Sequence, residues 1–250
     1  MKEKIAISID KDVLKEVDQR IDNKTLQNRS QAIEYLLRKS LDKIPINQAM
    51  IMSRPEDLKY LLTKIQNKVV LEQNYEVLLK AGIEKVYLIT QEHESLKEIK
   101  TKFPQIIIIK IKTMRGTADN IKALRKKVTS DFIVINSDTF YDFDLKKMLE
   151  KHKSTNRILT LGIISTTDAE KYGSVKLEGE RIVEFKQKEV TSPIINAGVY
   201  VFSPKIFDYL DKDTISMESD VLPTLVRENQ VTGFFMYGKY IHIQNMDNIQ

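Results

Sequence analysis

The N-terminal part of the chain shows two kinds of apolar pattern. Between residues 4 and 9 isoleucine stands at every second position, which is typical of a strand with one buried face. Two stretches with apolar residues at helical spacing follow. They begin after Asp10 and after Ser30, which are both good helix N-caps. We therefore expect residues 1–43 to form one short strand and two helices.

Beyond Pro45, which ends the second helix, strand-like and helix-like runs alternate along the chain. We expect strands at residues 49–52, 85–90, 106–110, 132–136, 158–164, 174–177, 197–202, 233–236 and 240–243. We expect helices at residues 71–81, 93–102, 117–128, 145–152, 204–209 and 218–228. This order predicts a linker at 44–47 and an α/β domain at 48–250. Its sheet should be mostly parallel and Rossmann-like, with helices on both faces.

Composition excludes several classes of protein. Cysteine is absent, which rules out disulfides, thiolate catalysis and cysteine metal sites. No apolar run is long enough for a membrane span and no signal-peptide core is present, so we expect a cytoplasmic protein without a membrane partner. The net charge of +5 permits nucleic-acid binding without requiring it. Abundant Lys, Glu and Ile, without Cys or Trp, are typical of a thermophile.

One strand and two helices are too few to close a hydrophobic core, because a segment this short buries too little surface. A second copy of the chain would supply the partner strand. We therefore expect a homo-oligomer, which is a dimer if residues 1–43 alone pair. A second contact between the larger domains would make a tetramer.

The element order of residues 1–43 resembles the ribbon-helix-helix DNA-binding family. In that family paired strands enter the DNA major groove, and the N-terminus of the second helix holds a phosphate. The resemblance implies a double-stranded DNA operator as partner. The residues that it implies for DNA contact are Lys2, Lys4, Ala6, Ser8, Asn28, Arg29 and Ser30. The alternative interpretation is that residues 1–43 serve for dimerisation only.

Six short segments of the larger domain resemble, in order, motifs of the sugar-phosphate nucleotidyltransferases, which make nucleotide sugars. They lie at residues 67–72 with 79–83, 115–119, 136–139, 171–175, 196–200 and 217–221. The resemblance implies that residues 115–119 form the base-binding loop and that the last three segments lie on the sugar side. The strand at 132–136 leads to Asp138, and strand ends of this kind form the ligand crevice of an open α/β sheet. The resemblance implies Asp138 as a metal ligand. The ligand-binding candidates that it implies are Gly116, Thr117, Asp138, Gly173, Gln187, Lys188, Asn196 and Gly198.

Two parts of the implied catalytic site depart from the family's pattern. The loop at residues 53–60 contains no glycine, although glycine lets backbone N–H groups approach a triphosphate closely. His242 stands where the family has its second metal aspartate, and an imidazole is a poorer Mg²⁺ ligand than a carboxylate. In addition, Gln187 replaces a sugar-binding glutamate. The sequence therefore predicts no catalytic residue and no bound cofactor.

Three functional hypotheses follow from these features. The first is a DNA-binding transcriptional regulator whose degenerate nucleotidyltransferase-like domain senses a nucleotide sugar or a sugar phosphate, or acts as an oligomerisation scaffold. The alternative is an active Mg²⁺-dependent sugar-1-phosphate nucleotidyltransferase that makes a nucleotide sugar. In the third, the larger domain binds nothing and only sets the geometry of an assembly.

Overall fold

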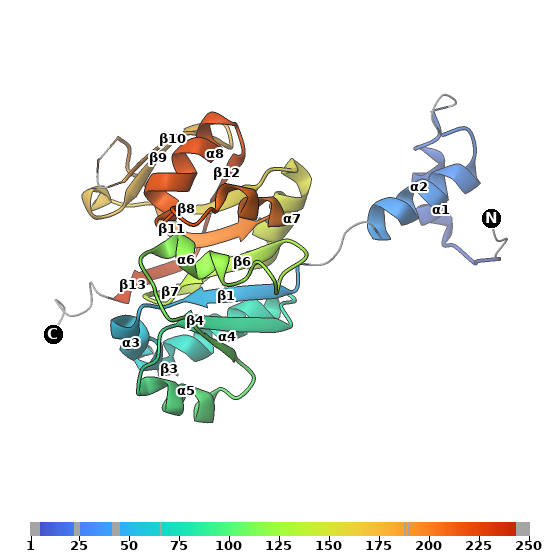
Figure 1. The fold of residues 1–250 in the computed structure, drawn as a ribbon. Coiled ribbons are helices and arrows are strands. Elements are labelled where there is room, and N and C mark those ends of the chain that lie inside the picture. Colours follow the sequence, from blue (N-terminus) through green and yellow to red (C-terminus); the bar gives the residue numbers. More distant parts are fainter. Residues whose placement is uncertain are drawn as a thin grey trace. The chain divides into compact units, whose positions relative to one another are not determined.

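The computed structural model of the protein describes residues 6–22, 26–41, 46–65, 67–187, 189 and 191–243. Contacts within the chain divide it into two compact units, Met1–Ile44 and Pro45–Gln250 (Figure 1). The first unit contains α1 (Lys11–Asp18) and α2 (Arg29–Leu41). Among the described residues, no helix is both long enough and apolar enough to cross a lipid bilayer.

The small unit buries few apolar side chains. Val17 and Ala32 are buried. About half of the residue surface is exposed at four other apolar or aromatic residues, Ile7, Val13, Tyr35 and Leu37. The described part of the predicted strand, residues 6–9, is not in a strand. A lone strand has no partner for its backbone hydrogen bonds, and the described part of this unit supplies none. Over the described residues 6–9, the predicted strand is therefore not formed in the single chain.

We expect the full-length chain to self-associate through the exposed apolar side chains of this unit, because so small a unit leaves them in water. Val13→Asp places a charge among them. It should lower the molar mass measured by size-exclusion chromatography with light scattering. Lys11→Asp adds the same residue at an exposed polar position of α1 and should change nothing. A wild-type chain that is monomeric at micromolar concentration would contradict this prediction.

In the described part of the larger unit, nine strands form one sheet. In spatial order they are β5 (Ile107–Lys110), β4 (Lys85–Thr90), β1 (Gln48–Met52), β6 (Phe132–Asn136), β11 (Ile194–Phe202), β8 (Leu159–Ser165), β12 (Val231–Phe235), β10 (Arg181–Gln187) and β9 (Gly173–Glu178). The helices are α3 (Leu58–Leu62), α4 (Val70–Lys80), α5 (Ser95–Lys102), α6 (Thr117–Lys122), α7 (Leu145–Thr155) and α8 (Leu222–Arg227). Short 3-10 turns lie at Pro55–Asp57, Ala169–Lys171 and Pro204–Tyr209, and a π-helical turn at Met217–Val221 precedes α8.

The sheet is mixed, so the prediction of a mostly parallel sheet is wrong. The strands β5, β4, β1 and β6 are parallel, and β12 is parallel to β8. In contrast, β11 runs antiparallel to both β6 and β8, and β10 runs antiparallel to β12 and β9. Gly179, with a φ of +60°, makes the tight turn between β9 and β10. The sequence pattern overlooked β10 because its charged residues interrupt the apolar alternation.

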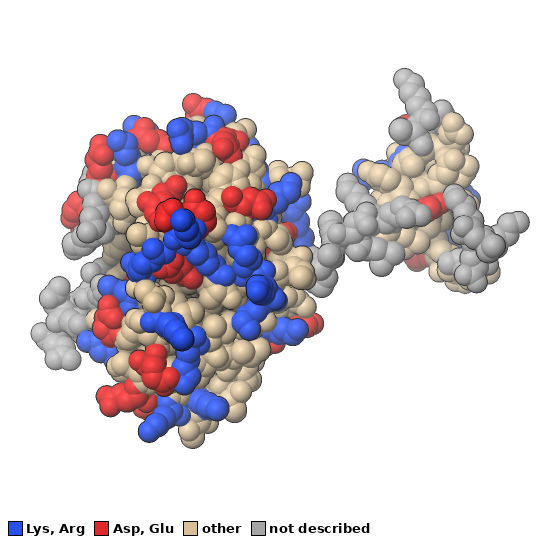
Figure 2. Space-filling view, in the orientation of Figure 1, with Lys and Arg blue, Asp and Glu red and all other residues tan. Residues whose placement is uncertain are grey.

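Hydrophobic clusters cover both faces of the sheet. Successive residues of a strand point to opposite faces, so β1 supplies Ile51 to one cluster and Met50 to the other. Helices α4, α5 and α7 cover the first cluster, for example with Leu78. Helices α6 and α8 cover the second, with Ile121 and Leu225. Figure 2 shows lysine and arginine side chains next to acidic ones on the face drawn.

A small two-stranded sheet lies next to the end of β6. Here β7 (Thr139–Asp142) pairs antiparallel with β13 (Lys239–His242), and His242 faces Thr139 in the register. A second pair, β2 (Lys64–Ile65) and β3 (Lys68–Val69), forms a hairpin before α4. The pairing of β7 with β13 brings the end of the described chain to the turn that follows β6.

Helix α7 contains a buried histidine. Only 2% of His152 is exposed, and its Nδ1 lies 2.9 Å from the Thr160 hydroxyl. Burial lowers the pKa of His152 to about 4. Since an unfolded chain protonates a histidine near its ordinary pKa of about 6.5, the unfolded state takes up the proton first as the pH falls. Because the folded chain keeps this ring neutral, the free energy of unfolding falls as the pH drops from about 6.5 to about 4.

His152→Gln should remove this pH dependence. We expect the wild-type free energy of unfolding to fall by about 2 kcal/mol more than that of the variant between pH 7 and pH 5. Urea unfolding at the two pH values measures the difference. His93→Gln, which replaces a histidine outside the core, is the control and should follow the wild type. Equal losses for wild type and His152→Gln would show that His152 does not cause the effect.

Candidate functional site

The carboxyl ends of β1 and β6 lie side by side at one edge of the sheet. The Ser137 N–H donates to the Met52 carbonyl at 2.9 Å, and the Ser53 N–H donates to the Ile89 carbonyl of β4 at 3.1 Å. Asp138 follows Ser137 directly. Its carboxylate therefore stands at the edge where parallel strands of an α/β sheet receive a ligand.

The side chains of Asp138 and His242 contact each other. The His242 Nε2 lies 3.3 Å from an oxygen of Asp138, and the Thr139 hydroxyl donates to the other oxygen at 3.2 Å. Burial raises the pKa of Asp138, but the hydrogen bonds from His242 and Thr139 and the charge of His242 outweigh burial and hold that pKa below its usual value. The His242 Nδ1 is buried and has no hydrogen-bond partner among the described residues.

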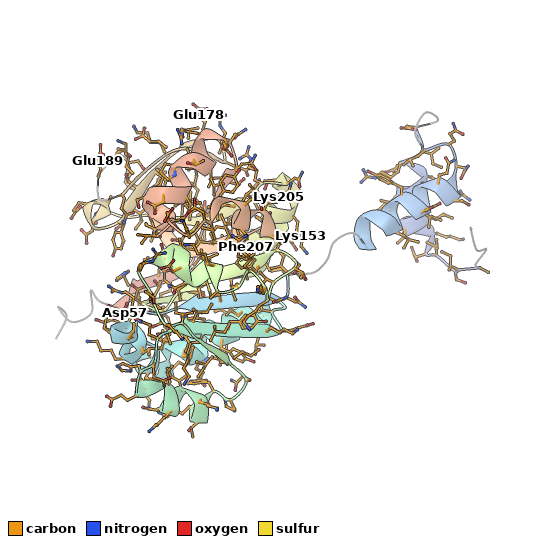
Figure 3. All side chains as sticks on the ribbon, in the orientation of Figure 1. Asp57, Lys153, Glu178, Glu189, Lys205 and Phe207 are labelled. Carbon is orange, nitrogen blue, oxygen red and sulfur yellow. The ribbon has the colours of Figure 1, made fainter. Side chains whose placement is uncertain are left out.

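In the loop after β1, the Arg54 side chain pairs with two carboxylates of the same loop. The Arg54 guanidinium lies 2.7 Å from Asp57 and 3.4 Å from Glu56 (Asp57 is labelled in Figure 3). The pKa of Arg54 is raised, first by the hydrogen bond to Asp57 and in smaller part by the nearby charges of Glu56 and Asp138. Two carboxylates of the same loop therefore partly neutralise its arginine.

His242 also lines a cavity of about 650 Å³. The Tyr172 ring meets the His242 ring edge-on, with centroids 5.6 Å apart. Burial raises the pKa of Tyr240 far above its usual value, so the phenol keeps its proton. A few polar groups among aromatic rings are typical of a small-molecule site. The side chains that define its chemistry are those of Thr166, Asp168, Tyr172, Phe235, Tyr237, Tyr240 and His242.

A second cavity of about 840 Å³ shares Ser165 and Thr166 with the first. Hydroxyl groups dominate its lining, with Thr167, Thr191 and Ser192 as further members. Together the two cavities offer aromatic faces and hydroxyl groups beside the Asp138–His242 pair. Both kinds of group suit a polyhydroxylated ligand.

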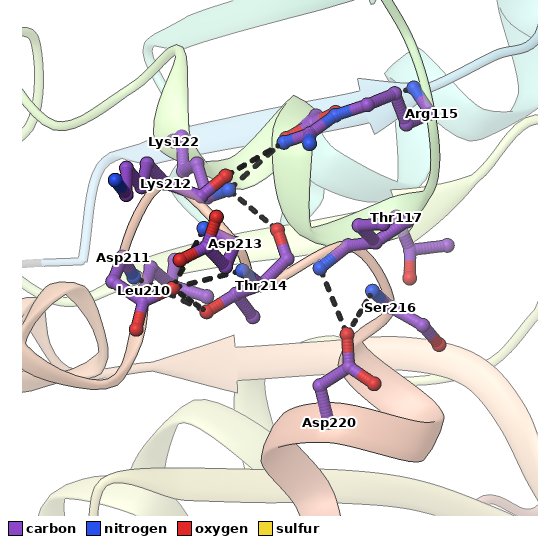
Figure 4. A network of polar contacts seen from close by, with 12 residues as sticks. Arg115, Thr117, Lys122, Leu210, Asp211, Lys212, Asp213, Thr214, Ser216 and Asp220 are labelled. Carbon is purple, nitrogen blue, oxygen red and sulfur yellow. Dashed lines mark hydrogen bonds and ion pairs between the residues drawn. The ribbon is translucent and has the colours of Figure 1, made fainter.

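The predicted residues Gly116 and Thr117 lie against the segment that precedes α8, and Figure 4 shows Thr117 near Ser216 of that segment. The Thr117 hydroxyl donates to Glu218 at 2.7 Å and accepts from the Met217 N–H at 2.9 Å. A Cβ atom at Gly116 would lie 2.5 Å from the Ile215 carbonyl oxygen, so only glycine allows this approach. The loop is thus fixed by close backbone packing.

The predicted residues Asn196 and Gly198 lie at an irregularity in β11, opposite the end of β6. Asn196 donates to the Tyr200 hydroxyl at 2.7 Å and accepts from the Gly198 N–H at 2.9 Å. Gly198 has a φ of +71°, and a Cβ atom there would lie 2.7 Å from the Asn136 amide nitrogen. The structure therefore brings this segment close to the turn that carries Asp138.

Two further predicted ligand residues, Gly173 and Gln187, pair with each other on the β9–β10 hairpin. Lys188 lies outside the described residues. Within the described part of the chain, no group of three or more His, Asp or Glu side chains could hold a metal ion. Asp138 and His242 thus form a two-donor site.

In the small unit, Arg29 does not have a free side chain. Its Nε and one terminal nitrogen each lie 2.7 Å from an oxygen of Asp18. Asn28 accepts from the Gln31 N–H at 3.0 Å, as a helix N-cap. Among the other predicted DNA contacts, Ala6, Ser8 and Ser30 are exposed. Lys2 and Lys4 lie outside the described residues.

Sequence reasoning missed Glu218, Tyr200, Tyr172 and Tyr240 as site residues. Segments 171–175, 196–200 and 217–221 were recognised as motifs, but only their glycines and Asn196 were selected. Each of these motifs contains an acidic or aromatic residue, namely Tyr172, Tyr200 or Glu218, that could have been selected as well. Tyr240 lies two residues before His242, in the segment compared with the family's second metal position, but its place in the site depends on the pairing of β13 with β7.

Comparison with known proteins identifies the larger unit. Residues 56–240 match the nucleotidyl transferase family. The mannose-1-phosphate guanylyltransferase catalytic subunit beta of Danio rerio is 31% identical over 195 residues, which are 73% of this chain and 54% of that protein. The D-glycero-alpha-D-manno-heptose 1-phosphate guanylyltransferase of Aneurinibacillus thermoaerophilus is 32% identical over 189 residues, which are 73% of this chain and 82% of that protein.

Solved structures show the same fold. The crystal structure of HddC from Yersinia pseudotuberculosis superposes with a TM-score of 0.67 at 24% identity, over 79% of this chain and 93% of that one. A putative glucose-1-phosphate thymidylyltransferase from Bacillus anthracis superposes with a TM-score of 0.71 at 15% identity, over 81% and 94%. The chain spans about half the length of the first curated relatives that it matches.

These findings correct the predicted function. The relatives carry the names of guanylyltransferases, and neither they nor the family match supports a DNA-binding regulator or a DNA operator as partner. The ribbon-helix-helix resemblance of residues 1–43 has no support either, since the family match covers residues 56–240. The described residues 6–9 form no strand, and Arg29 is bound to Asp18. By its mixed sheet and by the match over most of its length, the chain belongs to the nucleotidyl transferase family.

Proposed function

We propose that this protein is a sugar-1-phosphate guanylyltransferase, which joins GTP and a sugar 1-phosphate into a nucleotide sugar. The observation that carries the proposal is the Asp138 carboxylate, held ionised at the ends of β1 and β6 beside the aromatic cavity. Guanine and a manno-configured sugar are the first choice, because the relatives are named for mannose and manno-heptose 1-phosphates.

In this reaction a phosphate oxygen of the sugar 1-phosphate attacks the α-phosphorus of GTP. The bond from that phosphorus to the bridging oxygen of the β-phosphate breaks, and pyrophosphate leaves with the electron pair. Catalysis of such a transfer needs positioned reactants and positive charge around the phosphates rather than covalent help from the protein.

Asp138 and His242 are the residues that would hold a divalent cation. One carboxylate together with substrate phosphates is a common way to bind Mg²⁺. The imidazole, whose buried Nδ1 has no partner among the described residues, fits a softer ion such as Co²⁺ better than Mg²⁺. The cation would supply positive charge to the phosphates.

The loop after β1 limits how the triphosphate is held. It contains no glycine, and Arg54 shares its charge with Asp57 and Glu56. Few backbone N–H groups are therefore placed to donate to the phosphates. We infer that GTP binding depends on the base-side loop at Gly116 and Thr117 and on the cation more than on this loop.

Release of pyrophosphate from GTP and mannose 1-phosphate tests the proposal. Asp138→Asn should lower the rate by at least about 100-fold, because it removes the charge that holds the cation. Asp142→Asn changes an exposed aspartate of β7 and should leave the rate near that of wild type. UTP, ATP and dTTP, and other sugar 1-phosphates, are run in parallel to test the base and the sugar. No release from any pair of substrates with wild type would refute the proposal.

The choice of metal ion gives a separate prediction. His242→Asp should raise the affinity for Mg²⁺ and lower that for Co²⁺, because it exchanges an imidazole nitrogen for carboxylate oxygens. Calorimetry in the presence of a non-hydrolysable GTP analogue measures both, and we expect the ratio to change by about tenfold or more. The visible spectrum of bound Co²⁺ reports loss of the nitrogen ligand. His93→Gln is the control for other histidines, and an unchanged ratio in His242→Asp would exclude this role of His242.

A further inference from the structure

A single carboxylate joins the base-side loop to the β11 segment. One oxygen of Glu218 accepts from the Thr117 hydroxyl at 2.7 Å and from the Ser216 hydroxyl at 3.1 Å. The other oxygen accepts from the Tyr200 hydroxyl at 3.3 Å. Glu218 is half-buried, and hydrogen bonds to a charged group of this kind are stronger than those between neutral groups.

On the Thr117 side, three further hydrogen bonds join the loop to the segment that contains Glu218. The Ala118 N–H donates to the Ile215 carbonyl at 2.9 Å, in addition to the bond from the Met217 N–H to Thr117. The Arg115 side chain donates to the Lys212 carbonyl at 2.9 Å, as Figure 4 shows from close by. Backbone and side-chain hydrogen bonds therefore connect the loop to the segment around the π-helical turn.

On the other side, the Tyr200 hydroxyl is hydrogen-bonded to both Glu218 and Asn196. Tyr200 is 2% exposed, and its ring stacks on that of Phe202 with centroids 5.7 Å apart. Burial and the nearby Glu218 charge raise the pKa of Tyr200 well above its usual value, so the hydroxyl keeps its proton. It can then donate to Glu218 while it accepts from Asn196.

We propose that Glu218 and Tyr200 are positioning residues that couple the nucleotide half of the site to the sugar half. The inference rests on the proposed function: the loop at Thr117 would meet the nucleotide, and Asn196, in a segment that resembles the family's sugar-side motifs, would meet the sugar. Neither Glu218 nor Tyr200 needs to touch a ligand. Their hydrogen bonds fix the distance between two segments that a nucleotide sugar must contact at the same time.

The sharpest variant is Tyr200→Phe, which removes one hydroxyl and keeps the ring against Phe202. Glu218→Gln is the second variant, because an amide cannot accept from Thr117 and Tyr200 through both of its ends. Tyr209→Phe is the matched control. Its hydroxyl also donates to a glutamate, Glu228, but that pair is exposed and lies outside the site.

Hydrogen exchange of the protein without ligand tests the physical connection. Tyr200→Phe should speed amide exchange at residues 194–198, next to the lost hydroxyl, and also at residues 115–118. Tyr209→Phe should change neither segment. Faster exchange at 194–198 alone would overturn the proposal, because it would show that Tyr200 does not restrain the loop.

Calorimetry with GTP, mannose 1-phosphate and GDP-mannose tests the functional coupling. In Tyr200→Phe the affinity for GDP-mannose should fall by about tenfold, while each smaller ligand keeps its affinity within about twofold. Glu218→Gln should behave alike. A merely structural role would weaken all three ligands equally, and that result or an unchanged GDP-mannose affinity would overturn the coupling. If wild type binds none of the three, the proposed function fails, whereas the exchange experiment still decides whether the segments are joined.

Discussion

The burial of β6 in the middle of the sheet is the constraint on which the site depends. Residues Phe132 to Ile135 are each 0% exposed, and burying such a side chain stabilises the fold by about 1.5–3 kcal/mol. Neighbouring strands β1 and β11 pair with β6 on its two sides, so a slip in register would turn every side chain to the wrong face. The turn that carries Asp138 follows β6 directly, so the position of β6 also fixes the position of Asp138.

A carboxylate at such a place must be stabilised by its neighbours. Burial disfavours the charge of Asp138, and His242 and Thr139 restore it. His242 reaches Asp138 only because β13 pairs with β7, which begins at the next residue along the chain. Glu218 also accepts hydrogen bonds from other segments, from the hydroxyls of Thr117 and Tyr200. The site is thus an arrangement of partly buried acids, each provided with its donors by a different segment.

Family membership and chemistry depend on different features of this chain. The order of strands and helices, fixed by apolar burial, identifies the fold. The chemistry depends on single side chains, such as His242 in the metal position and Arg54 in a loop without glycine. The resemblance of residues 1–43 to a DNA-binding family depended on a short pattern, and short patterns of one strand and two helices occur in unrelated proteins. Arg29, one of its predicted contacts, is bound to Asp18, eleven positions earlier in the sequence.

The sequence alone determined the α/β class, the approximate bounds of most strands, and the position of Asp138 after a buried strand, because apolar periodicity directly reflects which faces are buried. It could not determine the direction of β11 or β10, since strand polarity in a sheet depends on how the connections cross it rather than on local pattern. The partners of Glu218 were equally hidden, because Thr117 lies 101 residues away. Tertiary structure decided these features: backbone pairing and close packing bring together side chains whose separation along the chain carries no local signal.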